Sequence, residues 1–142
     1  MRTAFVGAIL VLALSGPVVA QTTGPSAPEA VRPAADPLIG DWLVDLTGKP
    51  GDGPYYTDMR IDSVEGDRIT GTFYGSPIEK GRINRSWGTV RFAFVTHDGG
   101  GGTYNHSGEY LDGREIRGIS HALDRDFVMP WVAVRGKLPP EK

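Results

Sequence analysis

The sequence predicts an all-β domain, an eight-stranded antiparallel up-and-down β-barrel, and three observations predict it. Turn-forming residues recur roughly every 8 to 14 residues from position 41 onward, the segments between them alternate in polarity, and no window of about ten residues carries a helical apolar stripe. Eight short strands in an open sheet would leave two exposed edges, and closure into a barrel removes both.

A secretory signal peptide is predicted at residues 1–20. Arg2 gives a positive start, residues 4–14 form a short apolar run, and the small side chains at 18–20 form a cleavage site. The run is shorter than the ~20 apolar residues that cross a bilayer, so we expect no stable membrane span after processing. An uncleaved helix is the alternative, although Pro17 would end it. The prediction is a periplasmic or secreted protein.

Residues 21–36 are rich in Pro and Ala and poor in large apolar side chains, which predicts a disordered linker. Residues 37–138 are enough for one barrel domain. The sequence has no cysteine, which excludes disulfides, thiol catalysis and cysteine metal sites. The net charge is −2 and charges of both signs are interspersed, so the basic stripe of a nucleic-acid-binding protein is missing.

The first two predicted strands are residues 41–46 and 55–62, separated by a Gly- and Pro-rich loop. In the first strand, Trp42 shares one face with the apolar residues two and four positions later. In the second, alternate residues face the core, and Asp58 and Arg60 face solvent. This alternation is typical of antiparallel strands with one buried face.

The third predicted strand is residues 68–75 and the fourth is 76–84. In the fourth, Ile78 and Ile83 have opposite parity, so Glu79 faces inward only if no bulge lies between them. A tight turn, an inward apolar residue and an inward Gly recur at Gly71 and Gly118. An inward Gly lets a strand bend or a neighbour approach closely.

The last four predicted strands are joined by strong turn signals. The four consecutive glycines at 99–102 predict a flexible hairpin tip, since Gly tolerates positive φ. Asp112-Gly113 predicts a tight hairpin. These strands comprise residues 88–96, 103–111, 115–122 and 127–135.

With these elements placed, the chain resembles the calycin group of lipocalin-like and avidin-like barrels, whose first strand opens with Gly-x-Trp, as at residues 40–42. Residues 69–75 and 131–135 also resemble uncharacterised exported bacterial barrel domains. In the calycin group an Arg or Lys near the end of the last strand often packs over the first-strand Trp. The resemblance therefore implies that Arg135 covers Trp42 in a cation–π contact. It names no ligand.

Several polar and aromatic residues share the inward parity and predict a pocket of the composition usual for small-molecule sites. The alternative is a filled core with tyrosine hydroxyls at the barrel rims. The candidate ligand-binding residues are Tyr55, Thr57, Glu79, Tyr104, His106, Tyr110, Ser120 and Trp131.

The sequence favours an exported binding module for a small apolar or amphipathic ligand over two alternatives. One is a small isomerase or hydrolase in which His106 acts with Tyr104 or Glu79. The other is a structural or interaction domain with a filled lumen. In that case the lumen would be filled by Val90, Phe92, Phe94, Met59, Ile61 and Trp131.

The three histidines and Arg125 give weaker indications of function. The predicted faces of His97, His106 and His121 disagree, so we expect no metal site, and no motif indicates a cofactor. Arg125 lies between two aspartates before the last strand. We interpret it as part of local charge pairing, and the alternative is an anion clamp at one mouth of the barrel.

Overall fold

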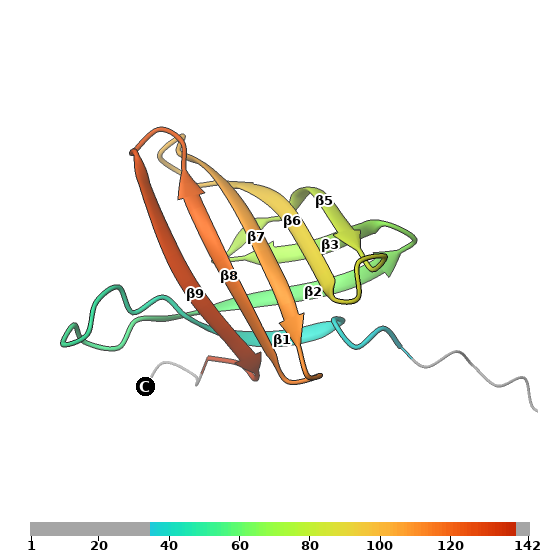
Figure 1. Cartoon of the computed structure of the whole chain (residues 1–142). Coiled ribbons are helices and arrows are strands. Elements are labelled where there is room, and N and C mark those ends of the chain that lie inside the picture. Colours follow the sequence, from blue (N-terminus) through green and yellow to red (C-terminus); the bar gives the residue numbers. More distant parts are fainter. Residues whose placement is uncertain (1–34, 139–142) are drawn as a thin grey trace, which may run out of the picture. The chain divides into compact units, whose positions relative to one another are not determined.

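A computed structural model of the chain describes residues 35–138 (Figure 1). The predicted signal peptide and the predicted linker up to residue 34 lie outside this range. Within it there is no α-helix, and hence none long and apolar enough to cross a membrane. The strands are β1 (Gly40–Asp45), β2 (Tyr56–Glu65), β3 (Arg68–Phe73), β4 (Ser76–Pro77), β5 (Glu79–Asn84), β6 (Val90–His97), β7 (Thr103–Leu111), β8 (Glu115–Ala122) and β9 (Phe127–Arg135).

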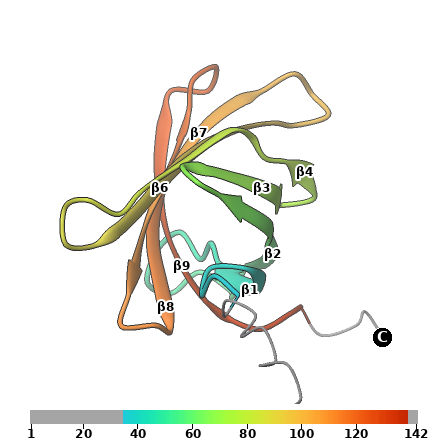
Figure 2. The same cartoon turned by 90° about the vertical axis from the view of Figure 1, so that its right-hand side faces the viewer.

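Eight of these strands close into an antiparallel barrel, and the ninth, the two-residue β4, pairs with β3 (Figure 2). Successive strands around the ring pair with their neighbours in the sequence, and β9 returns to β1 through the pairing of Trp42 with Arg135. The topology is therefore up-and-down. The predicted fold class is confirmed, and closure pairs both edges that an open sheet would expose.

The predicted fourth strand is broken into β4 and β5. The register of β5 against β6 shifts between Glu79 and Arg82, and Lys80 takes a positive φ of 52°. Such a bulge reverses which residues face inward. Ile78 and Ile83 consequently both pack toward the core, and Glu79 is exposed. The inward placement of Glu79 is thus corrected.

The hairpin turns follow the residues that predicted them. Asp112 and Gly113 both have positive φ, 46° and 72°, which is the conformation that twisted hairpins prefer. At the glycine tip, the backbone of Asp98 pairs with that of Gly102, and the amide of Gly101 donates to the carbonyl of Asp98 at 3.1 Å. Both turns therefore close short hairpins without long connecting loops.

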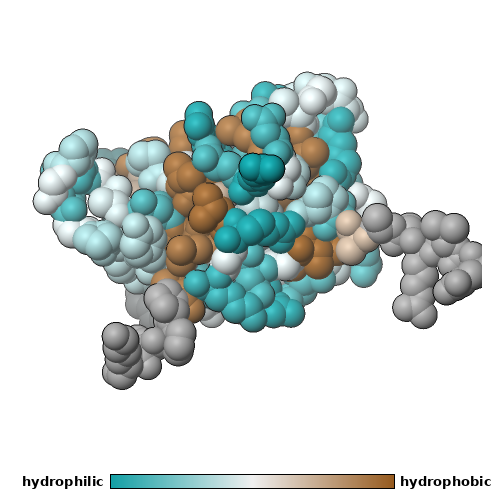
Figure 3. All heavy atoms as spheres, turned by 90° about the horizontal axis from the view of Figure 1, so that it is seen from below, coloured by the Kyte–Doolittle hydropathy of each residue, from teal (hydrophilic) through white to brown (hydrophobic). Residues whose placement is uncertain are grey.

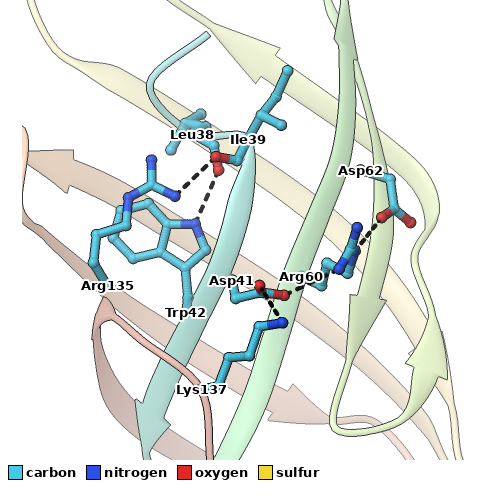
Figure 4. A network of polar contacts seen from close by, with 8 residues as sticks. All are labelled: Leu38, Ile39, Asp41, Trp42, Arg60, Asp62, Arg135 and Lys137. Atoms are coloured by element: carbon cyan, nitrogen blue, oxygen red, sulfur yellow. Dashed lines mark hydrogen bonds and ion pairs between the residues drawn. The ribbon is translucent and has the colours of Figure 1, made fainter. Parts of the chain in front are cut away.

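The segment before β1 closes one end of the barrel (Figure 4). Leu38 is buried in the core, and its carbonyl accepts a 2.9 Å hydrogen bond from the indole N–H of Trp42. The guanidinium of Arg135 lies 4.0 Å from the Trp42 ring centroid and donates to the carbonyl of Ile39 at 2.9 Å. The contact implied by the resemblance is present. Asp36, placed at the end of the linker from sequence, pairs with Arg85 of the barrel.

The core is packed by large side chains that alternate along the strands. Phe92, Phe94 and Trp131 lie among them, and the ring of Trp131 is 5.4 Å from that of Phe73. The most deeply buried of these side chains are Trp42, Leu38, Met59, Ile61, Ile116 and Val44.

The outer face is polar over most strands but not over β9. Val128, Val132 and Val134 of β9 are exposed, as is Ile119 of β8. Seen from below, the surface carries a band of apolar atoms bordered by hydrophilic residues (Figure 3). The strand β9 is therefore apolar on both faces, and its sequence alone does not separate inside from outside.

Gly118 is predicted to be required for the packing of Trp131. The two residues are paired across β8 and β9, and a Cβ at Gly118 would overlap the indole ring. We expect Gly118→Ala to lower the free energy of unfolding by about 1–3 kcal/mol, because overpacking forces a core ring from its position. Urea denaturation measures the change. The matched control is Gly53→Ala, in a loop, where an added Cβ would have no atom within 4 Å. This variant should unfold like the parent chain. Equal effects of the two substitutions would contradict this packing.

Candidate functional site

The end of the barrel opposite Leu38 contains a cavity of about 240 Å³. Because the strands alternate in direction, the loops β1–β2, β6–β7 and β8–β9 and the turn after β3 all meet at this end, on the left of Figure 1. The lining combines apolar and aromatic side chains with a few polar ones. The lining residues are Leu46, Tyr55, Phe73, Tyr74, Ser76, Thr96, Asp98, Tyr104, His106, Ser120, Arg125, Phe127 and Met129.

His106 forms the polar part of the cavity wall. Its Nε2 lies 2.8 Å from Oγ1 of Thr96, and its Nδ1 lies 2.7 Å from Oγ of Ser120. The three residues come from β6, β7 and β8, where Ser120 is the direct cross-strand partner of His106. The imidazole also packs on Phe94 and Phe73, with ring centroids 4.7 and 4.5 Å away. Two hydrogen bonds and two aromatic contacts thus fix the orientation of the imidazole.

Burial lowers the pKa of His106 to about 4, from an ordinary value of about 6.5. No carboxylate is among its hydrogen-bond partners, which are both hydroxyls. Near neutral pH the imidazole is therefore uncharged. With both ring nitrogens bonded to hydroxyls, the imidazole forms an uncharged part of the cavity wall.

One side of the cavity mouth is fixed by Asp98. Its carboxylate accepts hydrogen bonds from the amides of Gly100 and Gly102, at 2.9 and 2.8 Å, and from the hydroxyl of Tyr104 at 3.0 Å. Arg125 donates to the same carboxylate at 2.6 Å and lies over the Tyr104 ring. Arg125 is therefore charge-paired, but with Asp98 of another loop and not locally as the sequence suggested. This pairing disfavours an anion clamp.

These contacts shift two pKa values at the mouth. The pKa of Asp98 is lowered, first by the hydrogen bond from the backbone of Gly102 and then by that from Tyr104, with a smaller contribution from Arg125. The pKa of Tyr104 is raised, first by burial and then by its bond to Asp98. Both shifts favour an ionised Asp98 and a protonated Tyr104, so the bonds of Asp98 to Tyr104 and Arg125 are charge-assisted at neutral pH.

The other side of the mouth carries two tyrosines. Tyr55, beside β2, and Tyr74, after β3, meet edge to face with centroids 6.1 Å apart, and their hydroxyls are hydrogen-bonded. Both are about half exposed. They give the entrance an amphipathic edge, with apolar rings inward and hydroxyls near solvent.

The sequence-predicted site residues separate into three groups. Four of them line the cavity: Tyr55, Tyr104, His106 and Ser120. Three lie in the barrel interior and are not among the lining residues: Thr57, Tyr110 and Trp131. Tyr110 contacts Trp42 edge to face at 5.9 Å, at the closed end. Glu79 lies outside, with a carboxylate oxygen 3.7 Å from Nε2 of His97.

Several lining residues were missed by the sequence reasoning. Thr96 has the same parity as Phe92 and Phe94 in β6, and that parity alone could have identified it. Phe73 could have been found in the same way on β3. Met129 shares the inward parity of Trp131 and Ala133 on β9, so it could also have been found in this way. Asp98 carries no comparable signal, because it lies in the β6–β7 loop and its position depends on how that loop folds at the mouth.

The alternative chemistries find little support in this arrangement. His106 has neither Tyr104 nor Glu79 as a hydrogen-bond partner, so the acid–base pairs considered for an isomerase or hydrolase do not form. His97 and His121 are exposed, whereas His106 is buried. Among residues 35–138, no cluster of three or more His, Cys, Asp or Glu side chains could hold a metal ion.

No family model matches this chain, and neither curated proteins nor solved structures gave a match. The domain is a small closed barrel with a packed core at one end and a cavity at the other.

Proposed function

We propose that this protein is an exported binding module that takes a small, mainly apolar ligand into the open end of its barrel. The observation that carries the proposal is the cavity of about 240 Å³ between Phe73, His106 and Met129. Ligand pockets usually measure about 300 to 1,000 Å³ and combine apolar walls with a few convergent polar groups. This cavity is slightly smaller and has that composition. It suits a ligand of one ring or one short chain.

The filled-barrel alternative accounts for the closed half of the domain only. Of the six residues that it requires to fill the lumen, Val90 is partly buried and the others are buried in the core. The cavity is lined by a different set of residues, from the strand ends at the opposite end of the barrel and from the adjoining loops. A domain with a purely structural role has no need of that hollow, since cavities lower stability.

Export is supported by the first twenty residues. Arg2, the apolar run at 4–14 and the small residues at 18–20 have the order and the length of a secretory signal. The chain also lacks cysteine, so the barrel holds its shape by packing and needs no oxidising partner to fold. An exported module of this kind would meet ligands outside the cytoplasm.

Filling the cavity should abolish ligand binding. Met129 lines the cavity from β9, so Met129→Trp adds an indole there. We expect organic extraction and mass spectrometry of the purified chain to recover a small molecule from the parent and at least tenfold less from this variant.

The neighbouring substitution Val128→Trp is the matched control, because it adds the same bulk to a side chain that is 61% exposed on the same strand. It should retain the ligand. Failure to recover any small molecule from the parent chain, or equal recovery from both variants, would refute the binding function at this site.

A further inference from the structure

The contacts of His106 leave one hydroxyl hydrogen without an acceptor. A neutral imidazole carries one N–H, and Ser120 and Thr96 each carry one O–H, which makes three hydrogens in all. The two hydrogen bonds that join these residues use two of them. Neither hydroxyl has a second hydrogen-bond partner among the described residues.

The position of the spare hydrogen depends on the imidazole tautomer. If Nδ1–H donates to Ser120, the hydroxyl of Thr96 donates to Nε2 and the hydroxyl of Ser120 keeps its hydrogen. If Nε2–H donates to Thr96, the hydroxyl of Ser120 donates to Nδ1 and Thr96 keeps its hydrogen. Both residues line the cavity, and both are at least 95% buried. A buried donor without a partner is costly, so in either case the spare hydrogen needs an acceptor, which water supplies in the empty cavity and a ligand atom can replace.

We propose that the end of the ligand that enters the cavity carries an uncharged hydrogen-bond acceptor, of the carbonyl or ether type, which accepts from Ser120 or Thr96. This inference rests on the proposed function and specifies its ligand class. The tautomer of His106 can change to place the donor at either hydroxyl. The three residues can therefore meet an acceptor oxygen at two positions without moving a heavy atom.

A charged end group fits the cavity poorly. Of the described residues that line it, Arg125 is the one Lys or Arg side chain, and it lies at the mouth in an ion pair with Asp98. The inner wall offers Phe73, Met129 and the uncharged His106. A carboxylate placed there would lose its hydration without gaining a cation, which costs far more than burying a carbonyl that accepts one hydrogen bond.

Three matched probes test this class. They are 2-heptanone, 2-methyl-1-heptene, which replaces the ketone oxygen by a methylene group, and heptanoate. Their dissociation constants are measured by NMR titration at pH 7 for the parent chain and for the triple variant Thr96→Val, His106→Phe, Ser120→Ala. Replacing all partners of a buried network with apolar groups of similar shape can be nearly neutral for stability.

We expect the ketone-to-alkene affinity ratio to fall by between about two- and tenfold in the triple variant, because one neutral hydrogen bond is lost. Taking the ratio cancels the different hydrophobicities of the two probes. Heptanoate should bind the parent chain most weakly. An unchanged ratio, or tighter binding of heptanoate than of the ketone, would overturn the inference while leaving the binding function intact. Binding of none of the three probes would overturn both.

The orientation of the ketone gives a test that does not depend on folding of the variant. In the parent chain, the methyl group beside the carbonyl should show nuclear Overhauser effects to the ring protons of His106. If the methyl group at the far end of the chain shows them instead, the carbonyl points out of the barrel and the inference is wrong.

Discussion

Lowering the pH from 7.5 to 4.5 is expected to destabilise the barrel by about 2 kcal/mol through His106 alone. The pKa of His106 is about 4 in the folded protein and about 6.5 in the unfolded chain. Between these values the unfolded chain binds a proton that the folded protein does not. The contribution of the uncharged His106 to the free energy of unfolding is therefore fully present above pH 6.5, and it is lost as the pH is lowered toward 4.

Urea denaturation at the two pH values measures this loss. The substitution His106→Phe should remove that part of the pH dependence, since it replaces the buried imidazole by a ring that cannot be protonated. The matched control is His121→Gln, at an exposed position on the neighbouring strand, which should leave the pH dependence as it is in the parent. If His106→Phe and His121→Gln behave alike over this range, the imidazole is not held uncharged in the barrel.

Trp42→Ala is expected to cost about 3–5 kcal/mol of unfolding free energy, the range for removing a buried aromatic side chain. Trp42 is fully buried and joins three elements of the closed end. Its indole N–H binds the carbonyl of Leu38, Arg135 lies over its face, and Tyr110 meets its edge. Truncation leaves a cavity and also releases the segment that closes this end of the barrel.

The matched control for this prediction is Trp87→Ala. The side chain of Trp87 is 75% exposed in the β5–β6 loop, so its removal should change stability by no more than about 0.5 kcal/mol. Both variants retain the buried Trp131, so the fluorescence of that residue can report unfolding in each. A small effect of Trp42→Ala would show that the closed end is held together by other contacts.

The closed barrel could be predicted from the sequence because alternation and turn residues agree along nearly the whole chain. Asp112-Gly113 specifies a hairpin, and alternate burial in β2 and β6 follows directly from the residue pattern. Glu79 was misplaced because a bulge reverses parity, and whether a bulge forms depends on pairing with β6. On β9, apolar residues lie on both faces, so polarity alone does not distinguish the inner face from the outer one.

The candidate site was only partly predictable, for a geometric reason. Parity tells whether a side chain points into the barrel but not how far along the axis it lies. That height depends on the stagger of the strands. Tyr110 and His106 are both inward on β7, yet one lies at the closed end and the other at the cavity. The bond from Arg125 to Asp98 joins loops 27 residues apart in sequence, and no local pattern predicts it.

The most direct test is crystallographic, on crystals of the chain grown with and without 2-heptanone. We expect difference density for the ketone in the hollow half of the barrel, in contact with Phe73 and Met129 and with its oxygen near Ser120 or Thr96. A barrel whose own side chains fill this space in both crystals, or a ketone found only on the outer surface, would contradict it.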